Sequence, residues 1–375
     1  MTPETIHAVQ HPAGGDRPLR IAVLAPPWIP VPPPGYGGIE QVVALLCDAL
    51  HAAGHRVTLL AAPGSRAPGR VVELLERAHP DAIGAAVVEA DHAGRAFDVI
   101  AGAARRGEPF DVVHDHSGWV ALAMADRCAA PVVHTVHGPF DERAAAFYRA
   151  HGHRATLTCI SAAQAAARPD GVEIAAVVPN PVDVDAGSVR APKEEHVLWL
   201  GRFTPEKGPH RAIAVARRAG IPLVLAGPVQ PGQREFFERA VAPHLDGRGV
   251  RYAGEVGGVR KQLLLASARA LLMPIRWPEP FGMVMVEAMA AGTPVVAFAE
   301  GAAPEVVEHG RSGLLVADDD EMAAALGEAM RLRPEECRES ARERFAPARV
   351  AAAYVAVYRR AARAGGARPR LGVAA

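Results

Sequence analysis

The chain contains 375 residues, half of them hydrophobic, and this length and composition predict two domains with separate cores. Lysine plus arginine and aspartate plus glutamate both total 41, so the formal net charge is zero, which argues against nucleic acid or an anionic membrane as the main partner. The four cysteines lack paired metal-ligand spacing and indicate a reducing compartment, the cytoplasm.

Residues 1–18 are polar, with prolines and glycines and no apolar core, and are predicted to form a disordered leader and not a signal peptide. No run of about 18 apolar residues occurs, so no transmembrane segment is expected. From residue 20 onward, short apolar runs alternate with amphipathic segments, a pattern typical of parallel α/β sheets.

The first βα unit carries a glycine-rich loop. A strand is predicted at 20–25, a helix at 39–53 and the next strand at 56–61, with residues 35–38 (Gly-Tyr-Gly-Gly) directly before the helix. The spacing from Gly35 does not satisfy the G-x-G-x-x-G fingerprint, which disfavours a dehydrogenase. We interpret the loop as a phosphate or substrate cradle, with a plain turn as the alternative.

Residues 63–110 are less regular, with helices predicted at 71–78 and 93–106 and a short strand at 86–89. Two better strands follow, at 111–114 and 131–134.

Each of these two strands ends in histidines, and ligands bind at the carboxyl ends of strands in open parallel sheets. We single out His137, because Gly138 and Pro139 after it leave its backbone exposed, and place His116 second. A structural role is the alternative for either histidine.

A proline-rich segment from 179 to 192 is the best domain boundary, so domains are predicted at 19–186 and 187–345. Residues 346–375 would form a terminal helix crossing back to the N-terminal domain, followed by a flexible tail. Two further strands of the first half are predicted at 155–161 and 175–178. The second half repeats the α/β pattern, with strands predicted at 196–200, 222–226, 250–253, 270–273, 293–297 and 313–316 and helices at 262–267, 322–330, 338–345 and 349–362.

Charged residues gather in two loops of the second half. Arg202 and Lys207 lie between a strand end and a helix, where two cations form an anion clamp; a solvated loop is the alternative. The stretch 278–287 places Glu279 in a loop and Glu287 inside the following helix, whose unpaired first amides favour an anion. We interpret it as a sugar-phosphate site, with a proline-capped helix carrying two chance glutamates as the alternative.

Together, in this order, these motifs resemble the retaining glycosyltransferases of family 4 over about residues 20–362. The resemblance implies the α/β GT-B fold, in which two Rossmann-like doubly wound domains face each other across a cleft. It implies transfer of a hexosyl-type sugar from a nucleotide diphosphate sugar, more often UDP, to a hydroxyl of a small-molecule or lipid-linked acceptor. Such enzymes retain the anomeric configuration and need neither a metal nor a cofactor.

The resemblance also assigns roles to residues. Arg202 and Lys207 would neutralise the diphosphate, Glu287 would bind the ribose, and Glu279 would hold the sugar. His137 would sit beside the sugar as a further catalytic residue. The remaining donor-binding residues would be Gly37, Gly38, Val256, Phe281, Gly282, Met283 and Val284, with Tyr36, His116 and His137 facing the acceptor.

Other functions remain open at this point. A GT-B epimerase or a phosphorylase is one; the latter needs a Schiff-base lysine, and Lys207 and Lys261 are the only lysines expected in cleft-facing loops. A non-catalytic nucleotide-sugar-binding protein is another, but such a protein could lose His137 and Gly37, and both are present.

Overall fold

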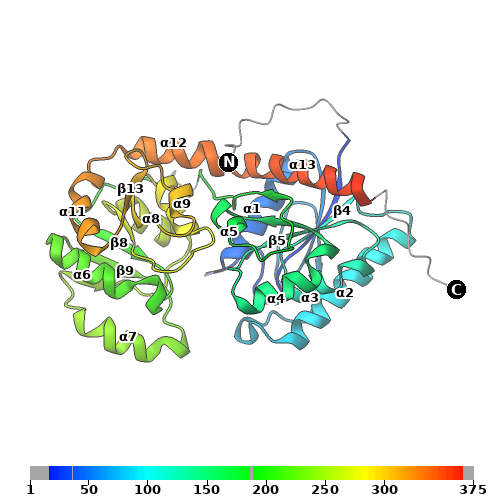
Figure 1. Ribbon diagram of the computed structural model, residues 1–375, viewed down its shortest axis with the longest axis horizontal. Coiled ribbons are helices and arrows are strands. Elements are labelled where there is room, and N and C mark those ends of the chain that lie inside the picture. The colour runs from blue at the N-terminus through cyan, green and yellow to red at the C-terminus, as the bar shows by residue number, and fades with distance from the viewer. Residues whose placement is uncertain (1–16, 36, 186–188, 366–375) are drawn as a thin grey trace.

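A computed structural model of the chain describes residues 17–35, 37–185 and 189–365. Figure 1 shows two α/β halves side by side, each built around a parallel sheet. Residues 1–16 of the predicted leader and the end of the predicted tail lie outside the described residues. Within the described part of the chain, no helix combines the length and the apolar character needed to cross a membrane.

The sheet of the N-terminal half has seven parallel strands in the order β3-β2-β1-β4-β5-β6-β7. Chain order reverses direction between β1 and β4, and such a switch point places a crevice at the carboxyl ends of the strands. The strands are β1 Arg20–Leu24, β2 Arg56–Ala61, β3 Arg70–Glu73, β4 Val112–Asp115, β5 Val132–Val136, β6 Thr156–Cys159 and β7 Ala176–Val177.

The sheet of the C-terminal half has six parallel strands in the order β10-β9-β8-β11-β12-β13, which repeats the topology with its switch point between β8 and β11. The predicted pair of doubly wound domains is therefore confirmed. The strands are β8 Val197–Leu200, β9 Leu223–Ala226, β10 Val250–Tyr252, β11 Leu271–Met273, β12 Val295–Phe298 and β13 Gly313–Val316.

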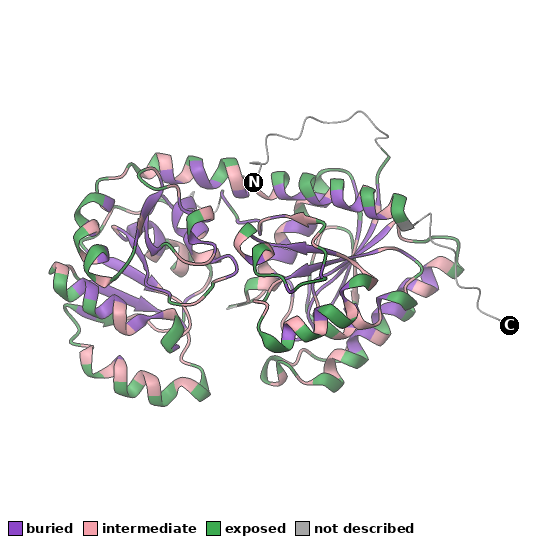
Figure 2. Ribbon diagram, viewed as in Figure 1, coloured by how far each residue is buried: buried purple, intermediate pink, exposed green. Residues whose placement is uncertain are grey.

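Helices cover both faces of each sheet, and most strand residues outside the edge strands β3 and β7 are buried, as Figure 2 shows. The helices of the N-terminal half are α1 Gly38–Ala52, α2 Ala86–Arg105, α3 Trp119–Ala123, α4 Glu142–His151 and α5 Ala162–Ala166. Those that follow are α6 Pro209–Ala219, α7 Arg234–Ala240, α8 Gly258–Ser267, α9 Met283–Ala290, α10 Ala303–Val306, α11 Asp319–Ala329, α12 Pro334–Phe345 and α13 Pro347–Gly365.

Two sequence predictions were wrong. The segment 71–78, predicted as a helix, contributes β3, because Val71 and Val72 pair with β2 and β-branched residues fit a pleated edge. The segment 86–89, predicted as a strand, is the first turn of α2. Tertiary packing, which a local pattern does not contain, decided both.

The terminal helix α13 returns from the C-terminal half and packs on the N-terminal half beside α1 (Figure 1). Its buried side chains include Val350, Tyr354, Val357 and Tyr358. They stand at positions i, i+4, i+7 and i+8 of the helix and so form one apolar stripe.

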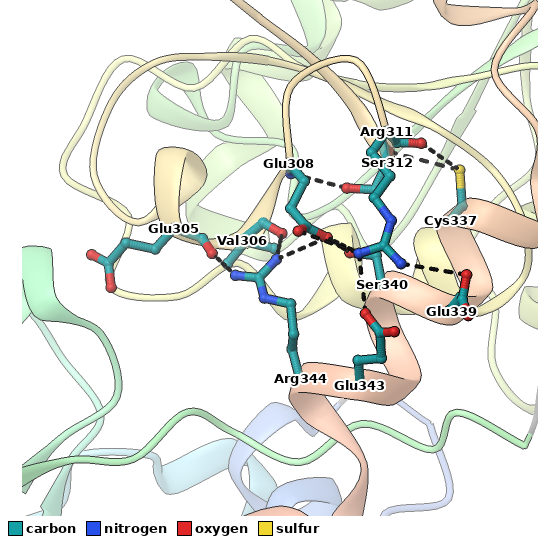
Figure 3. Close-up of polar contacts among 10 residues, drawn as sticks. All are labelled: Glu305, Val306, Glu308, Arg311, Ser312, Cys337, Glu339, Ser340, Glu343 and Arg344. Atoms are coloured by element: carbon teal, nitrogen blue, oxygen red, sulfur yellow. Dashed lines mark hydrogen bonds and ion pairs between the residues drawn. The ribbon is translucent and has the colours of Figure 1, made fainter. Parts of the chain in front are cut away.

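A polar cluster fastens α12 to the segment between α10 and β13 (Figure 3). Arg311 donates to Glu308 at 3.2 Å and to Glu343 at 3.0 Å, while Arg344 donates to the carbonyl of Val306 at 2.9 Å. The Glu305 carboxylate points away from this cluster and accepts hydrogen bonds at 2.5–2.6 Å from the first two amides of α5. Glu305 thus links the two halves through a helix N-terminus.

Truncating Val357 to alanine should lower the free energy of unfolding by about 1–2 kcal/mol, because the side chain is 1% exposed in the contact between α13 and the N-terminal core. Urea unfolding measures the change. Arg349→Ala, at an exposed position of the same helix, is the control and should change it by less than about 0.5 kcal/mol. Equal effects of the two substitutions would contradict the packing role of α13.

Candidate functional site

A cavity of about 640 Å³ lies between the two halves, lined by residues that follow β1, β5, β8, β9 and β11 and by parts of α1, α8 and α9. The predicted site residues that line it are Gly37, Gly38, His137, Arg202, Lys207, Val256, Glu279, Phe281, Gly282, Met283, Val284 and Glu287. Tyr36 lies outside the described residues.

The loop after β8 is held in shape by specific contacts. The indole of Trp199 donates to the carbonyl of Lys207 at 3.0 Å. Gly208 follows at φ +70°, and a Cβ there would lie 2.4 Å from the carbonyl oxygen of Pro274. A larger residue would therefore push this loop away from β11.

Lys207 forms an ion pair with Glu279, and both side chains are largely buried. Trp277 completes the unit, because its indole donates to the same carboxylate oxygen at 2.9 Å and the Lys207 ammonium stands 5.1 Å from its ring. Sequence reasoning gave Lys207 and Glu279 separate roles and did not single out Trp277, although a tryptophan two residues before Glu279 is a visible signal.

Arg202 lines the cavity with a buried Nε atom that has no hydrogen-bond partner among the described residues. Buried donors are almost always satisfied, so this one fits an anionic or carbonyl-bearing ligand. Asn180 also lines the cavity and has a buried Oδ1 with no hydrogen-bond partner among the described residues. A donor group of a ligand would satisfy it.

The first turn of α9 faces the same space. Gly282 caps the helix at φ +81°, and a Cβ at this position would lie 2.5 Å from the Cε atom of Met285. The amides of Met283 and Val284 have no backbone acceptor among the described residues. They are therefore free to donate to a ligand at this end of the cavity.

Glu287, one turn further along α9, accepts a hydrogen bond from Lys261 at 2.6 Å. The expectation that Lys261 lies in a loop was wrong, since it belongs to α8, where the run from residue 258 to 267 is continuously helical. The sequence alone does not connect Lys261 with Glu287, because the two residues are 26 positions apart and no local pattern links them.

On the N-terminal side, the loop before α1 is packed tightly. A Cβ on Gly37 would lie 2.7 Å from the Cβ atom of Pro33 and 3.0 Å from the Glu40 carboxylate. The opposite loop is close, since a Cβ on Gly257 would lie 3.6 Å from the Cα atom of Gly35. The two glycine loops therefore meet at the mouth of the cavity.

His137 lines the cavity half-buried, and burial, reinforced by nearby His134, lowers its pKa to about 3 despite the opposing charge of Asp115. Its Nε2 atom lies 2.9 Å from the Nδ1 atom of His116. His116, predicted to face the acceptor, is 2% exposed and absent from the cavity wall. Its two ring nitrogens instead contact His137 and His114.

Within residues 17–35, 37–185 and 189–365, no group of three or more His, Cys, Asp or Glu side chains is arranged to hold a metal ion. The carboxylates that line the cavity at positions 279 and 287 are each engaged by a lysine.

Two family models match the chain, Glycosyltransferase Family 4 over residues 36–186 and Glycosyl transferases group 1 over residues 184–344. A phosphatidyl-myo-inositol mannosyltransferase from Mycolicibacterium smegmatis is 32% identical over 341 residues, covering 82% of this chain and 84% of that protein. The chain belongs to the family 4 glycosyltransferases. It is therefore an enzyme that transfers a sugar from a donor.

Further relatives of this glycosyltransferase agree with that assignment. A D-inositol 3-phosphate glycosyltransferase from Mycobacterium avium is 30% identical over 371 residues, covering 84% of this chain and 86% of that protein. AviGT4, a glycosyltransferase involved in avilamycin A biosynthesis, matches with a TM-score of 0.69 and 31% identity over 92% of this chain and 98% of that one. Sucrose-phosphate synthase from Thermosynechococcus elongatus shares the fold, with a TM-score of 0.74 at 23% identity, covering 92% of this chain and 100% of that one.

Glu40 generates a prediction for the pH dependence of stability. Burial in the first turn of α1 raises the pKa of its carboxyl from 4.5 to about 7. The folded state thus holds a proton that the unfolded state releases, so the stability gained from the neutral carboxyl is complete below pH 4.5 and is lost as the pH rises through 7.

Glu40→Gln should therefore be more stable than the parent at pH 8 by about 1–3 kcal/mol and about equal to it at pH 4.5. Denaturant unfolding across this range measures the difference. Parallel stability curves for the two proteins would contradict a neutral, buried Glu40.

Proposed function

We propose that this glycosyltransferase moves a hexosyl-type sugar from a nucleotide diphosphate sugar, UDP being the first candidate, to a hydroxyl of a small-molecule or lipid-linked acceptor. The transfer would retain the anomeric configuration and require no divalent metal and no cofactor. The observation that carries the proposal is the convergence of Arg202, Lys207 and the unpaired first amides of α9 on one cavity.

A diphosphate matches this end of the cavity in charge. The unpartnered Nε of Arg202 and the Lys207 ammonium would bind its oxygens, and the amides of Met283 and Val284 would donate to them. Negative charge grows on the leaving phosphate as the glycosidic bond breaks, so fixed donors here stabilise the transition state more than the ground state. Two cations at this position take the part that a divalent metal would otherwise play.

The carboxylates fit positioning roles. Glu287, beside Lys261, would accept hydrogen bonds from the ribose hydroxyls, and Glu279 would do the same for the sugar. The backbone at Val256 would contact the base, with Phe281 and Gly282 beside the sugar and Gly37 and Gly38 across the cavity from the diphosphate. His137 would lie beside the sugar on the opposite wall.

Retention by double displacement needs a free carboxylate as nucleophile. Glu279 is engaged by Lys207 and Trp277, and Glu287 by Lys261, so neither is offered as one. We therefore favour front-face displacement, in which the leaving phosphate accepts the proton of the attacking acceptor hydroxyl. The bond from sugar to phosphate breaks as the bond to the acceptor oxygen forms.

The acceptor would bind against the N-terminal half. Two relatives carry names that state inositol-containing acceptors, and AviGT4 serves the biosynthesis of avilamycin A. A polyol, free or lipid-linked, is accordingly the acceptor class we favour. The alternative to a sugar transferase is a nucleotide-sugar epimerase or a non-catalytic nucleotide-sugar-binding protein. We also propose a cytoplasmic location, because all four cysteines are free thiols.

Lys207→Ala should abolish transfer while leaving the fold intact, because the substitution removes one of the two cations that face the leaving group. The parent is first screened with UDP-, GDP- and ADP-sugars by thermal shift, and turnover is then measured with the donor that raises the melting temperature. Arg218→Ala removes a cation of α6 that pairs with Asp320 outside the cavity and is the matched control. Normal turnover of Lys207→Ala would overturn the diphosphate assignment.

Glu287→Ala should weaken nucleotide binding by about tenfold, because two ribose hydroxyls lose a charged acceptor. Isothermal calorimetry with the free nucleoside diphosphate measures the dissociation constant. The same titration with the 2′,3′-dideoxy analogue of that nucleoside diphosphate, which lacks both ribose hydroxyls, should show no difference between the parent and the variant. Unchanged affinity for the complete nucleotide would remove the ribose role of Glu287.

A further inference from the structure

Three histidines form a buried chain behind the cavity wall, here called the histidine chain: His137, His116 and His114. His137 Nε2 lies 2.9 Å from His116 Nδ1, and His116 Nε2 lies 3.2 Å from His114 Nδ1. The first member lines the cavity, and the other two are at most 2% exposed.

Helix α13 closes the far end of the histidine chain. The hydroxyl of Tyr358 lies 2.6 Å from His114 Nδ1, across 244 residues of sequence, and the tyrosine is fully buried. His114 Nε2 lies 2.8 Å from the Thr135 hydroxyl, which also contacts the hydroxyls of Thr158 and Tyr354 at 3.0 Å each. A continuous polar path thus runs from α13 to the cavity.

All members of this path are neutral. Burial lowers the pKa of His114 and His116 well below the ordinary value of a histidine, and it lowers the pKa of His137 to about 3. Burial also raises the pKa of Tyr358 well above its ordinary value, so its hydroxyl keeps its proton. Each neutral imidazole has one nitrogen that donates and one that accepts.

The proton of Tyr358 sets the direction of the chain. Its hydroxyl has one hydrogen-bond partner among the described residues, the Nδ1 atom of His114, and a buried donor must be used. That nitrogen therefore accepts, and the proton of His114 lies on Nε2, where it donates to Thr135.

The same reasoning applies to the next two histidines. Tyr358 uses the single lone pair of His114 Nδ1, and an unprotonated His116 Nε2 at 3.2 Å would set a second lone pair against it, so His116 Nε2 carries the proton and His116 Nδ1 accepts. His137 then donates from Nε2, and its Nδ1 atom, which has no partner among the described residues, keeps a lone pair.

We propose that Tyr358 is a positioning residue that acts through the histidine chain and holds His137 in the tautomer with its proton on Nε2 and a free Nδ1 lone pair. His137 then meets a substrate hydroxyl as a hydrogen-bond acceptor and not as a donor. The inference about the tautomer concerns the ligand-free chain, whereas its consequence for turnover rests on the proposed function.

The tautomer is measured by NMR on the ligand-free enzyme labelled with ¹⁵N in its histidines, because protonated and unprotonated ring nitrogens have well-separated chemical shifts. The His137 signals are assigned by their loss in His137→Asn. We expect Nε2 to be protonated and Nδ1 unprotonated in the parent. Protonation on Nδ1, or on both nitrogens, would overturn the proposal.

Tyr358→Phe removes the directing proton and keeps the packed ring. Both directions of the chain then become possible, so the two His137 nitrogens should shift toward intermediate values. Turnover should fall by about fivefold, with the dissociation constant of the nucleoside diphosphate unchanged. Parent-like His137 shifts in this variant would overturn the proposal.

Tyr354→Phe is the matched control, because it removes another buried hydroxyl of α13 that contacts Thr135 and not a histidine. It should leave the His137 tautomer unchanged, and an equal shift in both variants would refute a specific role of Tyr358. If the tautomer responds as expected but no nucleotide sugar is turned over by the parent, the proposed function fails and the positioning inference stands.

Discussion

Lys207 pairs with Glu279 and Lys261 with Glu287. Both ends of the nine-residue segment 279–287 are therefore held by lysine side chains from other parts of the chain. Each carboxylate is largely removed from water, and an unpaired buried charge would cost several kcal/mol, about 3–5 by comparison with broken buried pairs. The pairs hold the loop after β8, helix α8 and the start of α9 together without a ligand. The proposed diphosphate would therefore meet cations that are already in position.

The doubly wound order of each sheet explains why these groups meet. Both sheets switch direction at their first strand, and residues of the loops after β1, β5, β8 and β11 line one cavity. Glycines that line the cavity allow two close contacts, at Gly37 against Pro33 and at Gly257 against Gly35. The proposed site residues on these loops are therefore brought to one cavity by topology and not by proximity in sequence.

The two walls of the cavity differ in how they are organised. The C-terminal wall uses ion pairs and unpaired amides, which can exchange partners when a donor binds. The N-terminal wall uses a chain of hydrogen bonds between neutral groups, in which the position of the proton on one ring determines its position on the next. Helix α13 supports that second wall, because the hydroxyl of Tyr358 contacts the last member of the histidine chain.

The sequence alone determined most of the fold, because buried parallel strands and amphipathic helices have distinct periodicities. It also determined most of the cavity wall, because glycines and charged residues follow the predicted strand ends. It mistook β3 for a helix, since an edge strand of four residues has little periodicity of its own. It also placed His116 at the acceptor and left Lys261, Trp277 and Tyr358 without roles.

Only the tertiary structure decided these points. Whether a histidine at a strand end lines a cavity, as His137 does, or is buried, as His116 is, depends on the packing of neighbouring strands. Whether Lys261 meets Glu287, or Tyr358 meets His114, depends on helices that fold back across 26 and 244 residues. Local chemistry is written in the sequence, but pairing between distant polar groups is fixed when burial leaves each of them a single available partner.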